Sequence, residues 1–514
     1  MPRRGRAAFV LTMVLSCATI VAVATGSAGA QSDSTRTRLG RWDWPTYGHD
    51  AQHTFHARTT LTPSRARALQ PAWTFPTGDA VTATPTVVAG TVYVGSWDGW
   101  FYAVALRTGT LRWKFQLDAQ PAVSPQPGHQ PRDFTSDGGM VTSSAWFQPG
   151  DAHQRDLVIF GGGYTLYALD ARTGRLVWKH AYTGRPDLPP DPVHDDARIF
   201  SSPVVADGRV MIGVSVDGSR GRRGTIVAAS LRTGDPIWRF ETDVDGGGRL
   251  LNDGCGNVWS SGTLLPKPEL VVFDVADCHF NNPLQYSETV LALHVGDGSL
   301  AWVFRPQRHD MQCDTDFGAT PNAGITARGT PTFLGVGSKD GTYYSIDPRT
   351  GALRWSTNVV FGGFTGGFIA TAAFDGARVY GSTALGDFGR FEGAGMVNCA
   401  PGNPRDLPFQ EPTVHVFDAR TGSVTRQATG APSFAPTTIA GNLTFNGLAL
   451  RDTVQVRDAG TGRLVTELTT PAPCWSGIAT AGNAIVFGTG ASHVGSPDGI
   501  LAYTPNGTAP EASE

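Results

Sequence analysis

Acidic side chains are concentrated in one short stretch, HDMQCDTDFGATP, which begins at His309. Asp310, Asp314 and Asp316 lie within it. Carboxylate oxygens are the ligands that calcium prefers in proteins, so this stretch can form part of a calcium site. A solvated loop that caps the ends of strands would have the same composition. Both interpretations stay open on these residues alone.

Two further residues are unusual for their type or setting. Lys339 is one of only four lysines, and it stands in a predicted turn, GSKDG. Trp259, in CGNVWSS, lies where an inner strand is expected to begin, so its ring can face a central channel or pack between sheets. No zinc-ligand spacing, Ser-His-Asp elbow or nucleotide-binding glycine loop accompanies these residues. His194, His279 and His309 are therefore expected to have surface or hydrogen-bonding roles.

These candidate residues lie in a sequence that contains internal repeats. One unit, VVAGTVYVGSWDGWFYAVALRTGTLRWKF, has the alternation and glycine turns of a four-stranded antiparallel meander. Its ending, a Thr-Gly turn followed by a strand with a Trp, recurs at Trp178, Trp238, Trp302 and Trp355. Two weaker copies end at Thr425 and Val465 and lack the Trp. We expect each Trp to pack on the turn of the neighbouring sheet rather than to form a ligand cage.

The last unit lacks one strand, and the other end of the chain supplies it. Residues 474–503 predict three strands, and LQPAWTF, which contains Trp73, predicts the fourth. Pairing these strands would close a ring and remove two open sheet edges, which a linear solenoid would leave exposed. The sequence therefore predicts an all-β, eight-bladed propeller over residues 69–505, preceded by an entry segment at 31–68 and followed by a disordered tail at 506–514.

Propeller geometry assigns the loops to two faces. The turns between the first and second and the third and fourth strands, which include the Thr-Gly turns, lie on one face, here the turn face. The loops between the second and third strands and the links between blades lie on the other, here the loop face. The acidic stretch, Trp259 and Lys339 are all expected on the loop face, as are the cysteines.

The N-terminus predicts export. Arg3, Arg4 and Arg6 precede an apolar stretch at 7–24 and a small-residue cleavage site at 28–30, so residues 1–30 are interpreted as a signal peptide. A membrane anchor is the alternative, but the stretch is short for a spanning helix and interrupted by polar residues. We expect a secreted or periplasmic protein with no membrane span. A net charge of −3 gives no reason to expect nucleic acid as a partner.

Export makes the cysteines candidates for disulfides. The segment after residue 30 holds five, an odd number, so at least one is expected to stay free or to pair between molecules. Cys255 and Cys278 belong to one predicted blade, and we expect either this pair or Cys278 with Cys313 to be bonded. No CxxCH motif occurs, so no covalent c-type haem is expected.

The repeat A-x-D-x-x-T-G-x-x-x-W resembles the pyrroloquinoline-quinone (PQQ) repeat, and the resemblance covers nearly the whole chain after residue 30. The entry segment WDWPTYGHDAQHT is similar to the start of quinoprotein alcohol dehydrogenases, closest to the polyvinyl-alcohol dehydrogenase-like branch. In that family PQQ lies flat on a Trp, calcium contacts its carbonyl oxygens, an Asp is the base, and an Arg or Lys contacts the quinone oxygens. Non-catalytic propellers carry the same repeat.

The resemblance assigns roles to four residues. Trp259 matches the Trp under the cofactor, and Asp316 matches the segment with the catalytic Asp, which is also a metal ligand. Lys339 matches the residue that contacts the quinone. Asp277 stands at the place of an Asn metal ligand, in LVVFDVADCHFNNP. In VDGSRGRRGT, Ser219 stands where the family has a Glu ligand, and the family's adjacent Cys pair is absent.

These observations favour an exported, quinoprotein-like dehydrogenase that oxidises a small or polymeric alcohol with PQQ and calcium and passes electrons to an external acceptor. The absent Glu and Cys pair favour an alternative, a non-catalytic propeller that binds protein or polysaccharide. A propeller hydrolase or lyase that uses the acidic stretch is a third interpretation.

Overall fold

The computed structural model describes residues 37–118, 140–151, 154–185, 197–216, 221–276, 285–306, 315–360, 362–363, 366–384, 412–490 and 499–511. They belong to one compact unit, which spans Arg36–Glu514. The predicted signal peptide lies outside these residues. Within the described ranges, no helix is long and apolar enough to cross a membrane.

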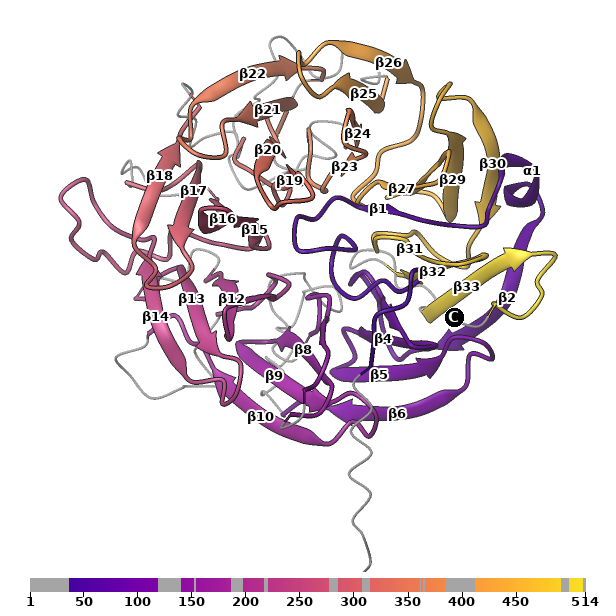
Figure 1. Ribbon diagram of the computed structural model, residues 1–514, viewed down its shortest axis with the longest axis horizontal. Helices are drawn as coiled ribbons and strands as arrows, with labels where there is room; N and C mark the ends of the chain where they lie inside the picture. Colours follow the sequence, from indigo (N-terminus) through magenta and orange to yellow (C-terminus); the bar gives the residue numbers. More distant parts are fainter. Residues whose placement is uncertain are drawn as a thin grey trace, which may run out of the picture. The chain divides into compact units, whose positions relative to one another are not determined.

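The described strands form eight sheets arranged as a ring, which confirms the predicted eight-bladed propeller (Figure 1). From the channel outwards, blade 1 contains β3 (Thr86–Val88), β4 (Thr91–Gly95), β5 (Trp100–Ala105) and β6 (Leu111–Gln116). Blade 2 contains β7 (Trp146–Gln148), β8 (Leu157–Gly162), β9 (Thr165–Asp170) and β10 (Leu176–Ala181). Blade 3 contains β11 (Val204–Ala206), β12 (Arg209–Val214), β13 (Thr225–Ser230) and β14 (Pro236–Glu241). Blade 4 contains β15 (Thr263–Pro266), β16 (Glu269–Val275), β17 (Thr289–His294) and β18 (Leu300–Phe304).

The second half of the ring follows the same plan. Blade 5 contains β19 (Asn322–Ile325), β20 (Pro331–Gly337), β21 (Thr342–Ile346) and β22 (Leu353–Asn358). Blade 6 contains β23 (Ala373–Phe374), β24 (Arg378–Ser382), β25 (Val414–Asp418) and β26 (Val424–Ala428). Blade 7 contains β27 (Thr438–Ala440), β28 (Leu443–Gly447), β29 (Thr453–Asp458) and β30 (Leu464–Thr469). Blade 8 contains β31 (Ala479–Ala481), β32 (Ala484–Thr489), β33 (Gly499–Pro505) and β2 (Leu69–Pro76).

The ring is closed as the sequence predicts. β2 pairs antiparallel with β33, with Leu69 opposite Pro505 and Phe75 opposite Ile500. Two strands from opposite ends of the chain thus satisfy each other's backbone groups, which would otherwise form open edges. The described residues after β33 continue into contacts with the ring: the Asn506 N–H donates to the Ala68 carbonyl, and the Glu511 N–H donates to the Asn483 side chain.

The repeated Trp residues join neighbouring blades, as expected. The Trp113 Nε1–H donates to the Ala171 carbonyl, 3.1 Å away, and its ring covers Gly174, where a Cβ would come within 2.5 Å of the ring atoms. Gly174 has a φ of +69°, so glycine suits this turn on both counts. The same arrangement occurs at Trp73, Trp178, Trp238, Trp302 and Trp355.

Two blades replace this Trp with other residues, each one position after the residue at which the sequence analysis ends the repeat. The partner of Trp113 in β5 is Ala103, and the equivalent pairs in blades 6 and 7 place Arg426 opposite Val416 and Thr466 opposite Val456. The weaker repeats therefore continue past Thr425 and Val465. Arg426 keeps part of the Trp interaction, because its Nη1 donates to the Ala459 carbonyl at 3.3 Å.

A second connection between blades lies close to the channel. Here a Ser or Thr hydroxyl of one blade accepts a hydrogen bond from a backbone N–H of the preceding blade. Four such bonds, of 2.9 to 3.0 Å, run in series through the first five blades. They join Thr84, Ser144, Ser202, Ser261 and Thr320. The series, here called the hydroxyl chain, satisfies buried donors that no strand pairing reaches.

The entry segment runs along the innermost strands instead of standing apart from the ring. Its backbone hydrogen-bonds to Val87, Phe147, Leu264, Ala323, Phe374, Ile439 and Gly482, so it contacts seven blades in turn. One piece, β1 (His56–Ala57), pairs in parallel with β27 as an extra strand of blade 7. Figure 1 shows this indigo segment crossing the centre of the ring.

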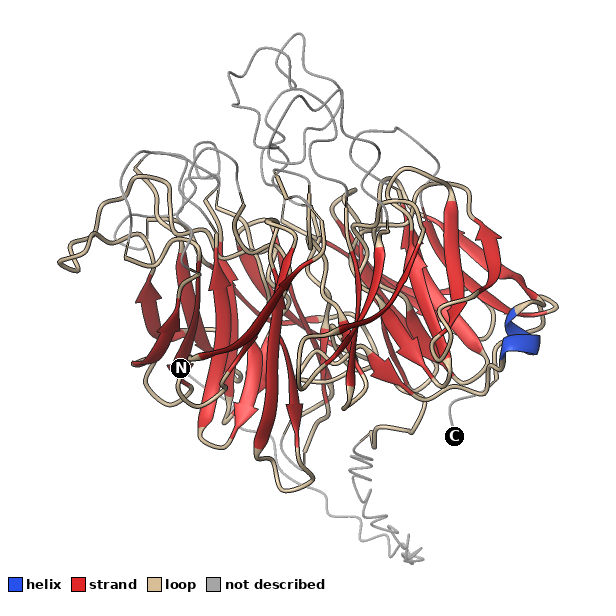
Figure 2. Ribbon diagram, turned by 90° about the horizontal axis from the view of Figure 1, so that it is seen from above, coloured by secondary structure: helices blue, strands red, loops and turns tan. Residues whose placement is uncertain are grey.

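The helix α1 (Pro63–Ala66) leads from the entry segment to β2 and lies at the rim (Figure 2). It begins at the N-cap Thr62, whose side chain accepts a hydrogen bond from the Arg65 N–H, and Pro63 occupies the first turn.

Candidate functional site

Three of the predicted site residues lie together on the loop face. The Nζ of Lys339 is 2.8 Å from Oδ1 of Asp316, and it lies 5.4 Å from the centre of the Trp259 ring. Both charged side chains are buried, with 10% of the Lys339 and 1% of the Asp316 side chain exposed. The propeller brings them together from three loops: the link before β15, the link before β19 and the turn between β20 and β21.

The backbone fixes the Lys339–Asp316 ion pair. The Lys339 N–H donates to the Asp316 carbonyl at 2.8 Å, and the Ser338 hydroxyl donates to the same carbonyl at 3.0 Å. The turn is itself held by Asp340, which accepts from the Thr342 N–H and from the Tyr344 hydroxyl. The two side chains of the pair therefore start from backbones that already touch, which limits the entropy lost on pairing.

Trp259 packs closely against a glycine. A Cβ placed on Gly318, in the next blade, would come 3.1 Å from the Trp259 ring and 3.1 Å from the Ile369 backbone. Trp259 is only partly buried, unlike its neighbours Val258 and Ser260. Part of its ring is therefore accessible beside the Lys339–Asp316 ion pair.

Partly exposed side chains stand at the same place in most innermost segments. Thr82, Thr142, Phe200, Trp259, Ile369, Phe434 and Trp475 each precede an innermost strand and alternate with buried residues. Phe434 and Trp475 make an edge-to-face contact with ring centres 5.0 Å apart. The channel mouth therefore has an apolar arc over blades 7 and 8, as well as Phe200 and Trp259.

A third ionisable residue, Asp274, belongs to this site, and the sequence analysis did not select it. It lies near the end of β16, is 1% exposed, and neither carboxylate oxygen has a hydrogen-bond partner among the described residues. Burial raises the pKa of Asp274 well above its usual value, and the charge of Asp316 adds to this, while the Ser260 hydroxyl and Lys339 lower it. Burial therefore favours the neutral form of Asp274, and a bound cation would favour the ionised form.

The entry segment contributes Tyr47 beneath these residues. Its hydroxyl is 3.0 Å from Oγ1 of Thr371, and burial raises the pKa of Tyr47 to about 12, to which the charge of Asp274 contributes. His53 holds this part of the segment, with Nδ1 2.9 Å from the Tyr47 carbonyl and Nε2 2.8 Å from the Gly262 carbonyl. The entry segment thus lines the channel on the side away from the loop face.

Several predicted residues lie outside the described part of the chain. Asp277, the proposed second metal ligand, is one of them, as are Asp310, Asp314 and Ser219. Among the described residues, no group of three or more His, Cys, Asp or Glu side chains could hold a metal ion. The roles assigned to Trp259, Asp316 and Lys339 stay predictions, although the three residues adjoin.

Two cysteines lie in the described part of the chain. Cys255 is disulfide-bonded, and Cys474 is free and fully buried. No other cysteine is described, so the partner of Cys255 lies outside the described residues. Burial raises the pKa of the Cys474 thiol to about 12, which disfavours the reactive thiolate form.

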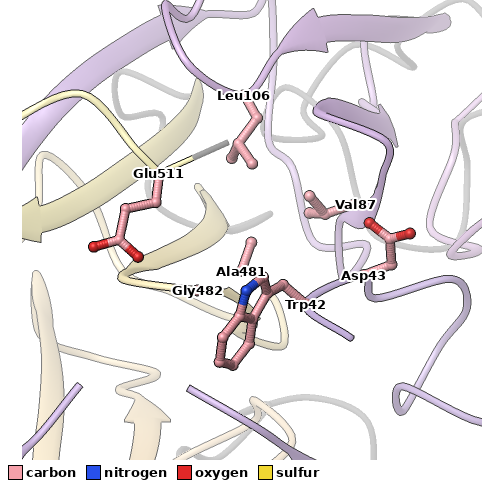
Figure 3. A pocket seen from close by; sticks show the side chains of 7 residues that line it. All are labelled: Trp42, Asp43, Val87, Leu106, Ala481, Gly482 and Glu511. Carbon is pink, nitrogen blue, oxygen red and sulfur yellow. The ribbon is translucent and has the colours of Figure 1, made fainter. Parts of the chain in front are cut away.

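One pocket lies away from the loop face, where the entry segment meets blades 1 and 8. Figure 3 shows its lining, which is Trp42, Asp43, Val87, Leu106, Ala481, Gly482 and Glu511. It has no room for even a water molecule, so it is a packing defect rather than a ligand site.

The eight-bladed fold, with Trp259, Asp316 and Lys339 together on the loop face, is that of the quinoprotein-like propellers. A family model described as "Glucose/ethanol/alcohol dehydrogenase, beta-propeller domain" matches residues 44–359, and the chain belongs to this family. The matched range includes Trp259, Asp274, Asp316 and Lys339.

Individual relatives agree with this placement. The chain is 22% identical over 364 residues to a polyvinylalcohol dehydrogenase of Pseudomonas sp., covering 63% of this chain and 52% of the relative. It is 26% identical over 423 residues to the dehydrogenase subunit of a quinone alcohol dehydrogenase of Gluconacetobacter polyoxogenes, covering 74% and 53%. The chain thus spans about half the length of the curated relatives it matches.

The fold comparison gives the same architecture. The crystal structure of quinohemoprotein alcohol dehydrogenase from Comamonas testosteroni superimposes with a TM-score of 0.71 at 19% identity, covering 91% of this chain and 82% of that one. At this identity the likeness shows the fold alone.

Proposed function

We propose that the protein is an exported alcohol dehydrogenase that binds PQQ and calcium on its loop face. The observation that carries this proposal is the buried Lys339–Asp316 ion pair beside the accessible ring of Trp259. A positive charge and a proton acceptor at the edge of an aromatic floor are what a quinone-dependent alcohol oxidation requires.

The residues present fit both groups. The partly exposed ring of Trp259 offers an aromatic surface on which a planar cofactor can lie, and Gly318 has no side chain that would crowd the edge of this ring. For calcium, Asp274 offers two buried carboxylate oxygens without partners among the described residues, and its carboxylate interacts electrostatically with that of Asp316. Asp277 stays a predicted third ligand.

The chemistry of this chain's own residues follows from their positions. When bound, PQQ would supply the two-electron acceptor for the hydride from the alcohol carbon. Asp316 would accept the proton of the alcohol hydroxyl, and Lys339 favours the ionised form of Asp316 that can do so. Lys339 would also donate a charge-assisted hydrogen bond to a quinone oxygen. The apolar arc with Phe434 and Trp475 would contact the carbon chain of a small or polymeric alcohol.

Electrons would pass to an external acceptor, because the sequence contains no CxxCH motif for a covalent haem. The second candidate is a non-catalytic propeller that binds protein or polysaccharide through the loop face. It is favoured by Ser219 at the place of the family's Glu ligand and by the absent Cys pair.

Calorimetric titration of the purified protein with PQQ, with and without calcium, separates the two candidates. The dehydrogenase binds PQQ more tightly with calcium, shows quinone absorbance after reconstitution, and reduces a redox dye in the presence of an alcohol. The scaffold binds no PQQ under either condition and reduces no dye with any alcohol.

A further inference from the structure

Asp274 occupies a position that glycine holds in most of the ring. The equivalent residue is found by following the cross-strand pairs from the Trp position of the outermost strand to the second strand and counting two residues further along it. This residue is glycine in six blades and Ser382 in blade 6. Blade 4 alone has a charged residue there. The glycines are Gly95, Gly161, Gly213, Gly337, Gly447 and Gly488.

Packing explains why glycine recurs at this position. A Cβ on any of the six glycines would come within 2.1 to 2.4 Å of the innermost segment of the following blade. At Gly337, for example, the nearest atom is Cβ of Phe368, at 2.3 Å. The blades therefore approach most closely here, and a side chain at this position is enclosed between two blades.

The exception lies at the candidate site. Asp274 is enclosed between blades 4 and 5, where Asp316 and Lys339 act on it electrostatically. Ser382, the other polar residue at this position, forms hydrogen bonds with Asn446 and Thr437. The Asp274 carboxylate, in contrast, has no hydrogen-bond partner among the described residues. Burying a carboxylate without a partner is unfavourable, and the charge of Asp316 makes the ionised form of Asp274 still less favourable. A bound cation would offset both costs.

We propose that Asp274 is a metal-binding residue, which together with Asp316 binds a calcium ion in the protein even before the quinone is present. This inference rests on the proposed function and deepens it, because it supplies a carboxylate in a chain where Ser219 replaces the family's Glu. The metal is a hard cation because the two carboxylates offer only oxygen ligands.

The test uses the full chain without quinone, titrated with calcium chloride by calorimetry and followed by thermal unfolding. Wild type should bind calcium and unfold at a higher temperature with it. Asp274→Asn keeps the shape and removes the charge, and Asp274→Gly restores the residue of the other blades. Both should bind calcium at least tenfold more weakly, yet unfold at the same or a higher temperature than wild type when calcium is absent.

Asp43→Asn is the matched control. Asp43 is also a buried carboxylate, but it accepts hydrogen bonds from the backbone N–H groups of Gly40 and Ala89, away from the site. Its variant should bind calcium like wild type. The inference is overturned if wild type without quinone binds no calcium, or if both Asp274 variants bind it as wild type does.

A parallel titration with PQQ separates this inference from the proposed function. If the protein binds PQQ tightly and oxidises alcohol, but its calcium affinity is the same with and without Asp274, the proposed function is kept and the inference is overturned. If calcium binding depends on Asp274 but the protein binds no PQQ, the inference is kept and the proposed function is overturned.

Discussion

The ammonium group of Lys339 lies 2.8 Å from the carboxylate of Asp316, and the two side chains are buried together at the channel of the propeller. Removing either charge leaves the other buried without its partner, so variants of this pair report on function only if the fold is checked as well.

The site variants should separate into two effects if PQQ binds. Asp316→Asn should abolish dye-linked alcohol oxidation and weaken PQQ binding, since it removes the proton acceptor and a metal ligand. Lys339→Ala should weaken PQQ binding through the lost charge-assisted hydrogen bond, and Trp259→Ala should weaken it most. Fluorescence titration with PQQ, alongside circular dichroism, checks this. Unchanged PQQ affinity in all three folded variants would remove these residues from the cofactor site.

Deletion of residues 69–75 should unfold or aggregate the whole ring, because it leaves β33 as an open edge. Size-exclusion chromatography and thermal unfolding measure the outcome. A deletion variant that is monomeric and melts like wild type would show that β2 does not hold the ring together.

The Trp contacts between blades should dominate stability. Trp178→Ala should lower the free energy of unfolding by about 3–5 kcal/mol, as for other buried aromatic residues. In contrast, Arg426→Trp should stabilise the contact between blades 6 and 7 by about 0.5–1.5 kcal/mol, since Gly462 has no atom closer than 3.9 Å to an added Cβ. Chemical denaturation gives both values. A less stable Arg426→Trp protein would mean that blade 7 has adapted to the arginine.

The hydroxyl chain offers a matched pair of neighbouring serines. Oγ of Ser202 accepts the Ser144 N–H at 3.0 Å, so Ser202→Ala should leave a buried donor unsatisfied and cost about 1–3 kcal/mol. Oγ of Ser201 is buried with no partner among the described residues, so Ser201→Ala should be neutral or stabilising. Equal losses in the two variants would show that the hydroxyl chain adds nothing beyond packing.

His415 should make the protein sensitive to mild acid. Burial lowers the pKa of His415 to about 4, while Nδ1 and Nε2 contact Gln427 and Thr383. As the pH falls from about 6.5 to about 4, the unfolded chain gains a proton here and the folded one does not, so stability falls by up to about 3 kcal/mol. His415→Gln should lose this part of the pH dependence in unfolding curves. Parallel pH profiles for both proteins would contradict the assignment.

The repeat made most of the fold predictable. Thr-Gly turns and Trp residues at a fixed spacing gave the blade, and the orphan strand with Trp73 gave the closure, because both are local patterns. The path of the entry segment was not predictable, since its backbone hydrogen bonds to Val87 and to Ile439 depend on the finished ring. Arg426 was missed because the copy was ended three residues after the turn glycine Gly422, whereas the motif places the Trp position four residues after it, which the pairing of Arg426 with Val416 confirms.

The site was partly predictable, and only through family resemblance. Trp259, Asp316 and Lys339 stand in recognisable motifs, and the ring brings them together. Asp274 was passed over because its strand, LVVFDV, looks like an ordinary buried strand. Aligning the second strands of the eight blades would have revealed it, since the other blades have glycine or serine at that position.

The pairing of β2 with β33 also determines the order in which the molecule can be completed. The entry segment and β2 are synthesised first, yet their partners include Gly482 and the strand that ends at Pro505. Seven blades can form locally while the eighth waits for the last strand, and closure then joins residues at the greatest separation along the chain, the slowest kind of contact to form. Until that moment the growing chain carries two unpaired strand edges, so aggregation competes with folding until the ring is closed.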